Sequence, residues 1–129
     1  MIKRLVFLFT VFLTTIFSSV SFADWTWVSK NVDRTNFYVD FERIRKHDGY
    51  VYYWELGDYL QPNKFGLLSG KVYKQVDCKL LRYKTLSFSF HKEPMGGGTG
   101  DRLNLENREW QYPSPNSAGE DVLKSVCSW

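Results

Sequence analysis

The sequence predicts an α+β protein, in which a single antiparallel β-sheet of about six strands carries a C-terminal helix on one face. Three observations support this prediction. Short aromatic and β-branched segments alternate with turn residues through most of the chain. The last residues, from Ser117 onward, instead have helical periodicity. The two cysteines, Cys78 and Cys127, lie in the middle of the chain and in the predicted helix, so a disulfide between them ties the helix to the sheet.

The first 23 residues are typical of a secretory signal peptide. The basic pair Lys3-Arg4 precedes an apolar stretch at 5–17, and Ser21-Phe22-Ala23 places small residues at the −3 and −1 positions of a cleavage site. An uncleaved membrane anchor is the alternative, because the apolar stretch is close to the minimum of roughly 17 residues for a span. We expect cleavage after Ala23, which leaves residues 24–129 as one domain without a membrane span.

The composition of this mature chain limits its class and its location. Its length suits one small domain. The formal net charge of the whole chain is +3, and the loss of Lys3 and Arg4 lowers it to +1, so charge gives no argument for nucleic-acid binding. No cysteine lies near the cleavage site, so we expect no lipid anchor. The sequence therefore predicts a periplasmic or secreted protein of the bacterial envelope.

The first half of the sheet is expected from three segments. Residues 25–28 form a short apolar segment, and residues 36–41 alternate apolar and polar side chains with the period of two of a half-buried strand. His47-Asp48-Gly49 follows as a turn, in which Gly49 can adopt a positive φ. The most aromatic strand, 50–59, comes next. The side chains that share one face of that strand are Tyr50, Tyr52, Trp54 and Leu56.

A further strand is expected over 67–78, after a loop at 61–66. Its apolar side chains alternate with polar ones, and Cys78 lies on the apolar side. Lys71 and Tyr73 point the other way. This parity directs the sulfur of Cys78 towards the core of the protein.

The next strand, 80–91, changes the parity of its apolar residues part-way along. This change predicts a β-bulge near Lys84-Thr85, or two differently buried faces. A glycine-rich loop at 94–100 then leads to a last strand around 103–110. These two strands complete a sheet of about six.

The C-terminal helix is predicted from its cap and its apolar stripe. Ser117 and Glu120 have the spacing of a capping box, in which the serine accepts from the third helical amide and the glutamate reaches back. Asp121 places favourable negative charge in the first turn. A helix this short is marginal alone and must dock on the sheet. Its apolar stripe consists of Val122, Leu123, Val126 and Cys127.

The two cysteines are expected to form a structural disulfide. Cys78 lies on the buried face of a strand and Cys127 on the buried stripe of the helix, so both sulfurs point to the same layer. Closing the loop between them stabilises the fold by about 4 kcal/mol in the chain-entropy model. Two free buried thiols are the alternative. A redox pair normally shows Cys-x-x-Cys spacing, which this chain does not have.

A set of short motifs runs through nearly all of the predicted mature chain. They are Trp27, Phe37-Tyr38-Val39-Asp40, Asp58-Tyr59, Ser69 with Tyr73, Asp77-Cys78, Met95-Gly96, Trp110 ahead of Pro115-Asn116-Ser117, and Val126-Cys127. Through these motifs the sequence resembles the surface-adhesin E family of small exported bacterial proteins. The resemblance implies a six-stranded antiparallel sheet, with the C-terminal helix tethered to its concave face by a disulfide. It also implies a binding role, since the founding members are host-binding adhesins, whereas many relatives are small periplasmic or secreted domains.

No catalytic residues, metal ligands or cofactors are expected. His47 and His91 are the only histidines and lack zinc-site spacing, so we expect a solvated turn and an exposed strand end. The glycine run at 96–100 lacks the helix start that a phosphate-binding loop needs, which favours a flexible hairpin connection. Ser117 already has a capping role. The sequence thus predicts that the protein is not an enzyme, the alternative being a small hydrolase whose groups meet only in space.

The remaining candidate for function is a polar and aromatic sheet face. Basic residues with interleaved aromatics follow two neighbouring segments, and such a face can bind a protein or an acidic glycan through charge and stacking. The alternative is a solvated face whose lysines discourage edge-to-edge aggregation. The candidate binding residues are Lys71, Tyr73, Lys74, Lys79, Arg82 and Lys84.

The sequence therefore predicts an exported, non-enzymatic binding domain that recognises a host matrix protein or an acidic glycan. The alternative is a periplasmic structural or envelope-interaction domain without a host ligand. Exposed sheet edges and many aromatic residues allow a homodimer but do not require one.

Overall fold

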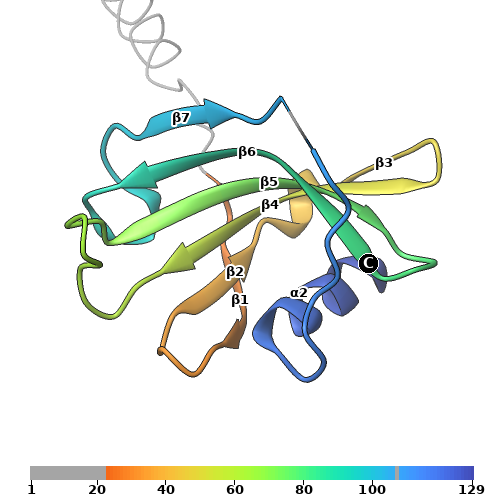
Figure 1. Cartoon of the computed structure of the whole chain (residues 1–129), viewed down its shortest axis with the longest axis horizontal. Coiled ribbons are helices and arrows are strands. Elements are labelled where there is room, and N and C mark those ends of the chain that lie inside the picture. Colours follow the sequence, from red (N-terminus) through yellow and green to blue (C-terminus); the bar gives the residue numbers. More distant parts are fainter. Residues whose placement is uncertain (1–22, 107) are drawn as a thin grey trace, which may run out of the picture.

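The computed structural model describes residues 23–106 and 108–129. The predicted signal peptide, apart from Ala23, lies outside the described residues. The described part folds into one antiparallel sheet with a single α-helix at the C-terminal end (Figure 1). No helix in this part is long and apolar enough to cross a bilayer. The predicted fold class is confirmed.

The sheet contains seven strands in the order β1-β2-β4-β5-β6-β7, and β3 pairs with the first residues of β4, along the edge that β2 occupies further on. All of its pairings are antiparallel. The elements are β1 (Thr26–Lys30), β2 (Asn36–Val39), the 3-10 turn η1 (Phe41–Arg43), β3 (Arg45–His47), β4 (Tyr50–Asp58), β5 (Ser69–Asp77), β6 (Arg82–His91), the 3-10 turn η2 (Pro94–Gly96), β7 (Asp101–Asn104) and α2 (Ala118–Cys127).

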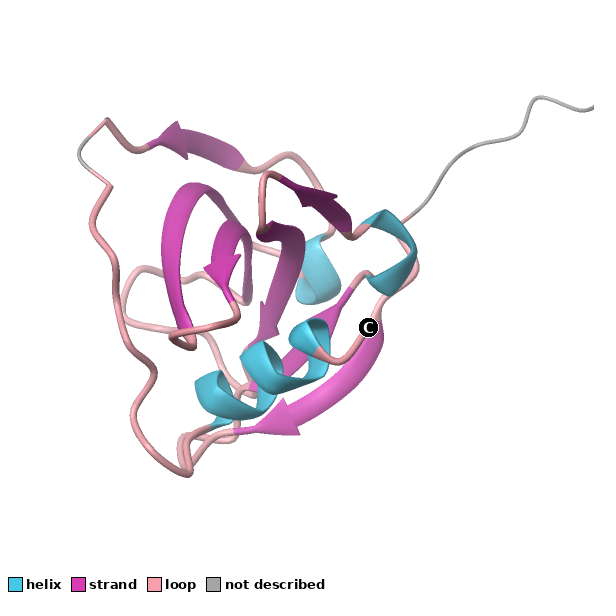
Figure 2. Cartoon of the chain, turned by 90° about the vertical axis from the view of Figure 1, so that its right-hand side faces the viewer, coloured by secondary structure: helices cyan, strands magenta, loops and turns pink. Residues whose placement is uncertain are grey.

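The strand register divides the sheet into two faces, because residues directly opposite each other share a face. On the helix face, α2 packs against β1, β2 and β4 and closes the core. Figure 2 shows the sheet curling around α2. On the other face, called the back face below, the described residues place no α-helix, and the 3-10 turn η2 lies over the Ser69 end of β5. The buried residues of the core are Val39, Val51, Tyr53, Val76, Val122, Leu123 and Val126.

The helix begins at the predicted cap. The Ser117 hydroxyl accepts a hydrogen bond from the Glu120 amide at 3.2 Å. The Glu120 carboxylate reaches back one residue further than expected, to the Asn116 amide at 3.4 Å. The physical reason is that the Ser117 amide already donates to the Ser114 carbonyl.

The predicted disulfide is confirmed. Cys78 follows the last residue of β5, Cys127 ends α2, and their Cα atoms lie 5.7 Å apart. Beyond the helix, the Trp129 ring packs on Phe41 with the ring centroids 5.0 Å apart. The end of the chain is therefore held on both sides of the disulfide, by the packing of α2 on the sheet and by the contact of Trp129 with η1.

Two strands differ from the prediction. β3 was not predicted because all three of its side chains are polar and exposed, so no apolar alternation marks it. The last strand was predicted at 103–110, but β7 covers Asp101–Asn104. After it, the Leu105 amide donates to the Leu86 carbonyl at 3.2 Å, and Gln111 forms an isolated bridge with Tyr83. The predicted bulge is present close to the expected place, since β6 has one extra residue, Leu86, opposite β5.

Candidate functional site

The six predicted binding residues do not share one surface. Lys74 lies directly opposite Tyr53 on the helix face and is buried. Its ammonium donates to both carboxylate oxygens of Glu55 at 3.1 Å and lies 4.4 Å from the centroid of the Tyr83 ring. Placing Lys74 on the candidate face was therefore wrong. Its parity, which it shares with Val72 and Val76, was the signal in the sequence.

The Lys74–Glu55 pair belongs to a buried polar cluster. The Tyr53 hydroxyl donates to Glu55 at 2.7 Å. Burial, together with the neighbouring Glu55 carboxylate, raises the pKa of Tyr53 well above its ordinary value. The cluster is an internal network of the core, because every charge in it has a partner.

Lys79 and Arg82 lie at the turn between β5 and β6. Lys79 is in the turn itself, and its amide donates to the Asp77 carboxylate at 3.1 Å. The Arg82 guanidinium donates to the other carboxylate oxygen of Asp77 at 2.9 Å. Partial desolvation acts to raise the pKa of Asp77, but the bonds from Arg82 and from the backbone amides outweigh it, so this pKa lies below its ordinary value.

The back face carries a series of ring contacts that the sequence only partly predicted. Trp54 stacks on Tyr73 with centroids 4.9 Å apart and ring planes 15° apart, and Tyr52 lies 6.3 Å from Tyr73. Towards the other end of β4, Tyr50 lies 5.6 Å from Trp110. We call these five residues the aromatic row.

Cations lie over both ends of the aromatic row. The Arg82 guanidinium and the Lys84 ammonium lie 4.4 and 4.5 Å from the centroid of Trp110. At the other end, the Arg102 guanidinium lies 5.4 Å from the centroid of Trp54. Ring faces attract cations electrostatically, so these contacts hold the charges close to the aromatic surface. Sequence reasoning missed Trp54, Trp110 and Arg102 as site residues; only Trp54 carried a signal, in its shared parity with Tyr50 and Tyr52.

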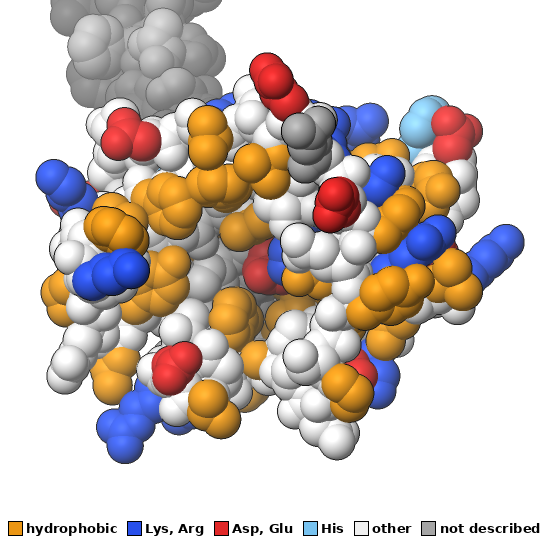
Figure 3. Space-filling view, viewed as in Figure 1, with side chains coloured by type: hydrophobic (Ala, Val, Ile, Leu, Met, Phe, Trp, Pro, Cys, Tyr) orange, Lys and Arg blue, Asp and Glu red, His pale blue; other side chains and the backbone are white. Residues whose placement is uncertain are grey.

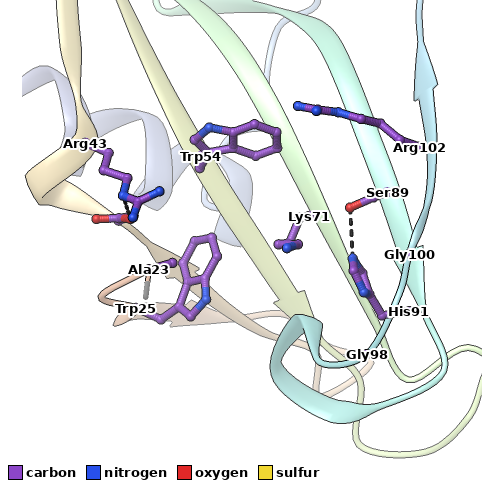
Figure 4. A pocket seen from close by; sticks show the side chains of 11 residues that line it. Ala23, Trp25, Arg43, Trp54, Lys71, Ser89, His91, Gly98, Gly100 and Arg102 are labelled. Atoms are coloured by element: carbon purple, nitrogen blue, oxygen red, sulfur yellow. Dashed lines mark hydrogen bonds and ion pairs between the residues drawn. The ribbon is translucent and has the colours of Figure 1, made fainter. Parts of the chain in front are cut away.

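A cavity of about 360 Å³ lies at the Trp54 end of the back face. Figure 4 shows Trp25 and Trp54 on one side of it, with Arg102 and the Ser89–His91 pair on the other. His91 was expected at an exposed strand end, and this is corrected by the structure, in which it is 3% exposed. It is buried because the following glycine-rich loop folds over it, and its Nδ1 lies 3.1 Å from the Gly97 carbonyl.

The glycine-rich loop is a connection between two antiparallel strands, as predicted, and β7 rather than a helix follows it. Its backbone is bonded to the sheet. The Gly96 amide donates to the Ser69 hydroxyl at 2.8 Å, and the Met95 amide donates to Asp58 at 2.8 Å. Gly96 has a φ of +69°, which favours glycine at this position. The loop is therefore held to the sheet by hydrogen bonds, and it lines one end of the cavity.

The helix face is only partly covered. Figure 3 shows hydrophobic side chains gathered over β6 and β7 beside a hollow. Phe90 is 40% exposed and Leu103 is 54% exposed. By register they share the helix face, with Phe88 directly opposite Leu103.

These features define a class of small α+β domains with one disulfide-tethered helix and an aromatic, cationic sheet face. Within it, the chain belongs to the surface-adhesin protein E family, whose model matches residues 25–128. Membership of this family makes the chain an adhesin-like surface protein. No curated protein sequence matches it.

Solved structures of Haemophilus influenzae protein E have the same fold. One structure of that protein has a TM-score of 0.60 at 16% identity, covering 86% of this chain and 89% of that chain. The structure of its crystal form II has a TM-score of 0.58 at 17% identity, covering 87% of this chain and 96% of that chain. The structure of protein E from non-typeable Haemophilus influenzae has a TM-score of 0.58 at 15% identity, covering 86% of this chain and 79% of that chain. At these identities the likeness concerns the fold.

Proposed function

We propose that this protein is an exported, non-enzymatic binding domain that recognises a host matrix protein or an acidic glycan through the back face of its sheet. One observation carries the proposal, namely the aromatic row with cations held over both of its ends. Aromatic rings offer large contact surfaces at low entropic cost, and cations attract acidic partners. Family membership supports the adhesin class.

Binding of this kind depends on salt. Exposed charges are screened over about 10 Å at 0.1 M ionic strength, so contacts with an acidic partner weaken as salt rises. The stacking contacts of the rings are less affected. We therefore expect binding that decreases with salt without vanishing.

The test is binding of the exported protein to immobilised matrix proteins and to sulfated and carboxylated glycans, between about 0.05 and 0.5 M salt. Lys71→Gln with Lys84→Gln removes two charges from the back face, and we expect affinity to fall about tenfold or more. Arg82 is left unchanged because it holds Asp77. The matched control, Lys64→Gln with Lys124→Gln, removes the same charge from a loop and from α2.

Two results overturn the proposal. Equal losses for both pairs of substitutions mean that the back face is not the site. Absence of saturable binding to every surface favours the alternative, a periplasmic structural or envelope-interaction domain. Release of the protein by osmotic shock, without surface labelling of intact cells, supports that alternative independently.

A further inference from the structure

We propose that the cavity at the Trp54 end of the back face is a subsite for one carboxylated pyranose, a sugar ring with a carboxylate and free hydroxyls. The proposal rests on the proposed function, because it names the unit of an acidic glycan that this face holds. Small-molecule sites span about 300–1,000 Å³, so a cavity of about 360 Å³ suits one ring rather than a longer chain.

The sheet register places two cations on one rung across the cavity floor. Lys71 lies opposite Ser89, and Ser89 lies opposite Arg102 on the next strand. Neighbouring strands are roughly 4.8 Å apart, so the two basic residues are about 10 Å apart at the backbone, with Ser89 between them. Their long side chains can meet at a single carboxylate. Figure 4 shows Lys71 in the middle of the cavity and Arg102 beside Trp54.

The charge of the cavity favours an anion. Its charged lining residues are Asp40, Arg43, Lys71 and Arg102. Asp40 is 1% exposed and lies 3.3 Å from Arg43, so that pair is neutral as a unit. Within the described part of the chain, no carboxylate forms an ion pair with Lys71 or Arg102. The cavity therefore presents two positive charges to a ligand.

Hydroxyl groups of the ligand have partners as well. His91 Nδ1 faces the Gly97 carbonyl, which can only accept, so Nδ1 carries a proton, and Nε2 lies 2.9 Å from the Ser89 hydroxyl. The Ser89 oxygen has two lone pairs, so whichever way this bond runs at least one remains for a donor from the ligand. The Asp40 carboxylate oxygens are buried and ion-paired with Arg43, so they are not partners for the ligand.

The remaining lining suits the ring itself. Trp25 and Trp54 border the same side of the cavity (Figure 4). The negative face of an indole ring attracts the C–H edge of a sugar ring. A uronic acid combines three groups that match this lining. Its carboxylate pairs with the cations, its hydroxyls bond to the acceptor, and its C–H face packs on the indole rings. A simple inorganic anion offers only the negative charge.

The first experiment is an NMR titration of the exported protein, after its N-terminal residue has been determined, because Ala23 borders the cavity. Glucuronate is the probe, and glucose is the matched neutral sugar. The chain has five tryptophans, whose indole N–H signals report on separate places. We expect glucuronate to shift Trp25 and Trp54 and to leave Trp27 and Trp129 unmoved. Equal shifts with glucose, or no shift at Trp54, overturn the subsite.

A variant measures the contribution of the cations. Lys71→Met keeps the stem that packs against Gly96 but loses the charge, and we expect glucuronate affinity to fall about tenfold. Lys71→Arg restores it, and Lys64→Gln leaves it unchanged. Full affinity in Lys71→Met overturns the proposal, and the indole spectrum verifies that each variant is folded.

Two further comparisons complete the test. The first distinguishes a free sugar acid from the end of a glycan chain as the ligand, and the second distinguishes failure of the subsite from failure of the proposed function. Methyl glucuronide blocks the anomeric oxygen as a glycan chain does. Equal affinity for it supports a chain end as ligand, whereas its exclusion supports a free sugar acid. Loss of glucuronate binding with intact binding to matrix proteins or polymers overturns the subsite alone. Absence of binding both to glucuronate and to matrix proteins or polymers overturns the proposed function together with the subsite.

Discussion

At the scale of single residues, Asp77 connects the end of β5 to the start of β6. Its carboxylate accepts from the amides of Lys79 and Leu80 and from the Arg82 guanidinium. Arg82 in turn lies over Trp110. One carboxylate thus shapes the turn and positions a cation of the candidate face.

The lowered pKa of Asp77 makes a prediction about acid stability. A carboxylate whose pKa is depressed in the folded state stabilises the fold above its unfolded pKa, and this stabilisation is lost as pH falls through the folded pKa. Asp77→Asn keeps an oxygen for the amides but loses the charge. We expect the variant to melt below wild type at pH 7, and the difference to shrink below the ordinary carboxyl pKa of 3.8.

Thermal melts of both proteins between pH 2.5 and 7 check this prediction. Asp33→Asn, at an exposed position, is the control for a general loss of negative charge. A melting difference that stays constant over the whole pH range contradicts the depressed pKa.

At the scale of elements, α2 depends on two different supports. Its buried stripe packs on the sheet, and the disulfide fixes its last residue next to β5. Its ten residues are too few for a stable isolated helix in water. The helix and the sheet therefore form one cooperative unit.

Cys127→Ser tests the contribution of the disulfide. The bridged residues are 49 positions apart, for which the chain-entropy model gives about 4 kcal/mol. For a domain of this size, such a loss lowers the melting temperature by about 15 °C or more. We also expect faster hydrogen exchange in the last turn of α2.

The double variant Cys78→Ser/Cys127→Ser separates the loss of the bridge from the effect of a new free thiol. An unchanged melting temperature in both variants means that packing alone holds the helix.

At the scale of the whole molecule, one face of the sheet packs on α2, and in the described part of the chain the back face is covered only at one end, by the glycine-rich loop. The helix covers β1, β2 and β4 on the inner side, and the rest of the back face remains open. A homodimer remains a prediction, and the exposed Phe90 and Leu103 offer apolar surface for it. The aromatic row and the cavity both belong to the open face.

Maturation of the chain gives a whole-molecule prediction. Small residues at the −3 and −1 positions predict cleavage after Ala23, two residues before β1 begins. Intact mass spectrometry of the exported protein should therefore give the mass of residues 24–129 with the disulfide formed. Ala23→Arg should leave unprocessed precursor, because the −1 position requires a small side chain. A mass that includes residues 1–23 in the wild type contradicts this prediction.

Much of the fold followed from local pattern. The period of two in β4 and β5, the cap at Ser117 and the parity of Cys78 predicted the sheet, the helix and their disulfide. These features are local, because side-chain direction in a strand or a helix follows from position along the chain. The strand β3 and the early end of β7 were not predicted, because their pairing is fixed by partner strands rather than by apolar alternation.

The sequence by itself determined the fold class, the helix cap and the pairing of the two cysteines. Only the tertiary structure decided the candidate site. It moved Lys74 into the core, because Glu55 on the neighbouring strand compensates its charge there. It also brought Trp110 and Arg102 onto the back face from segments far along the chain. The physical reason is that a binding surface depends on which strands are neighbours, and strand order is set by packing over long sequence separations.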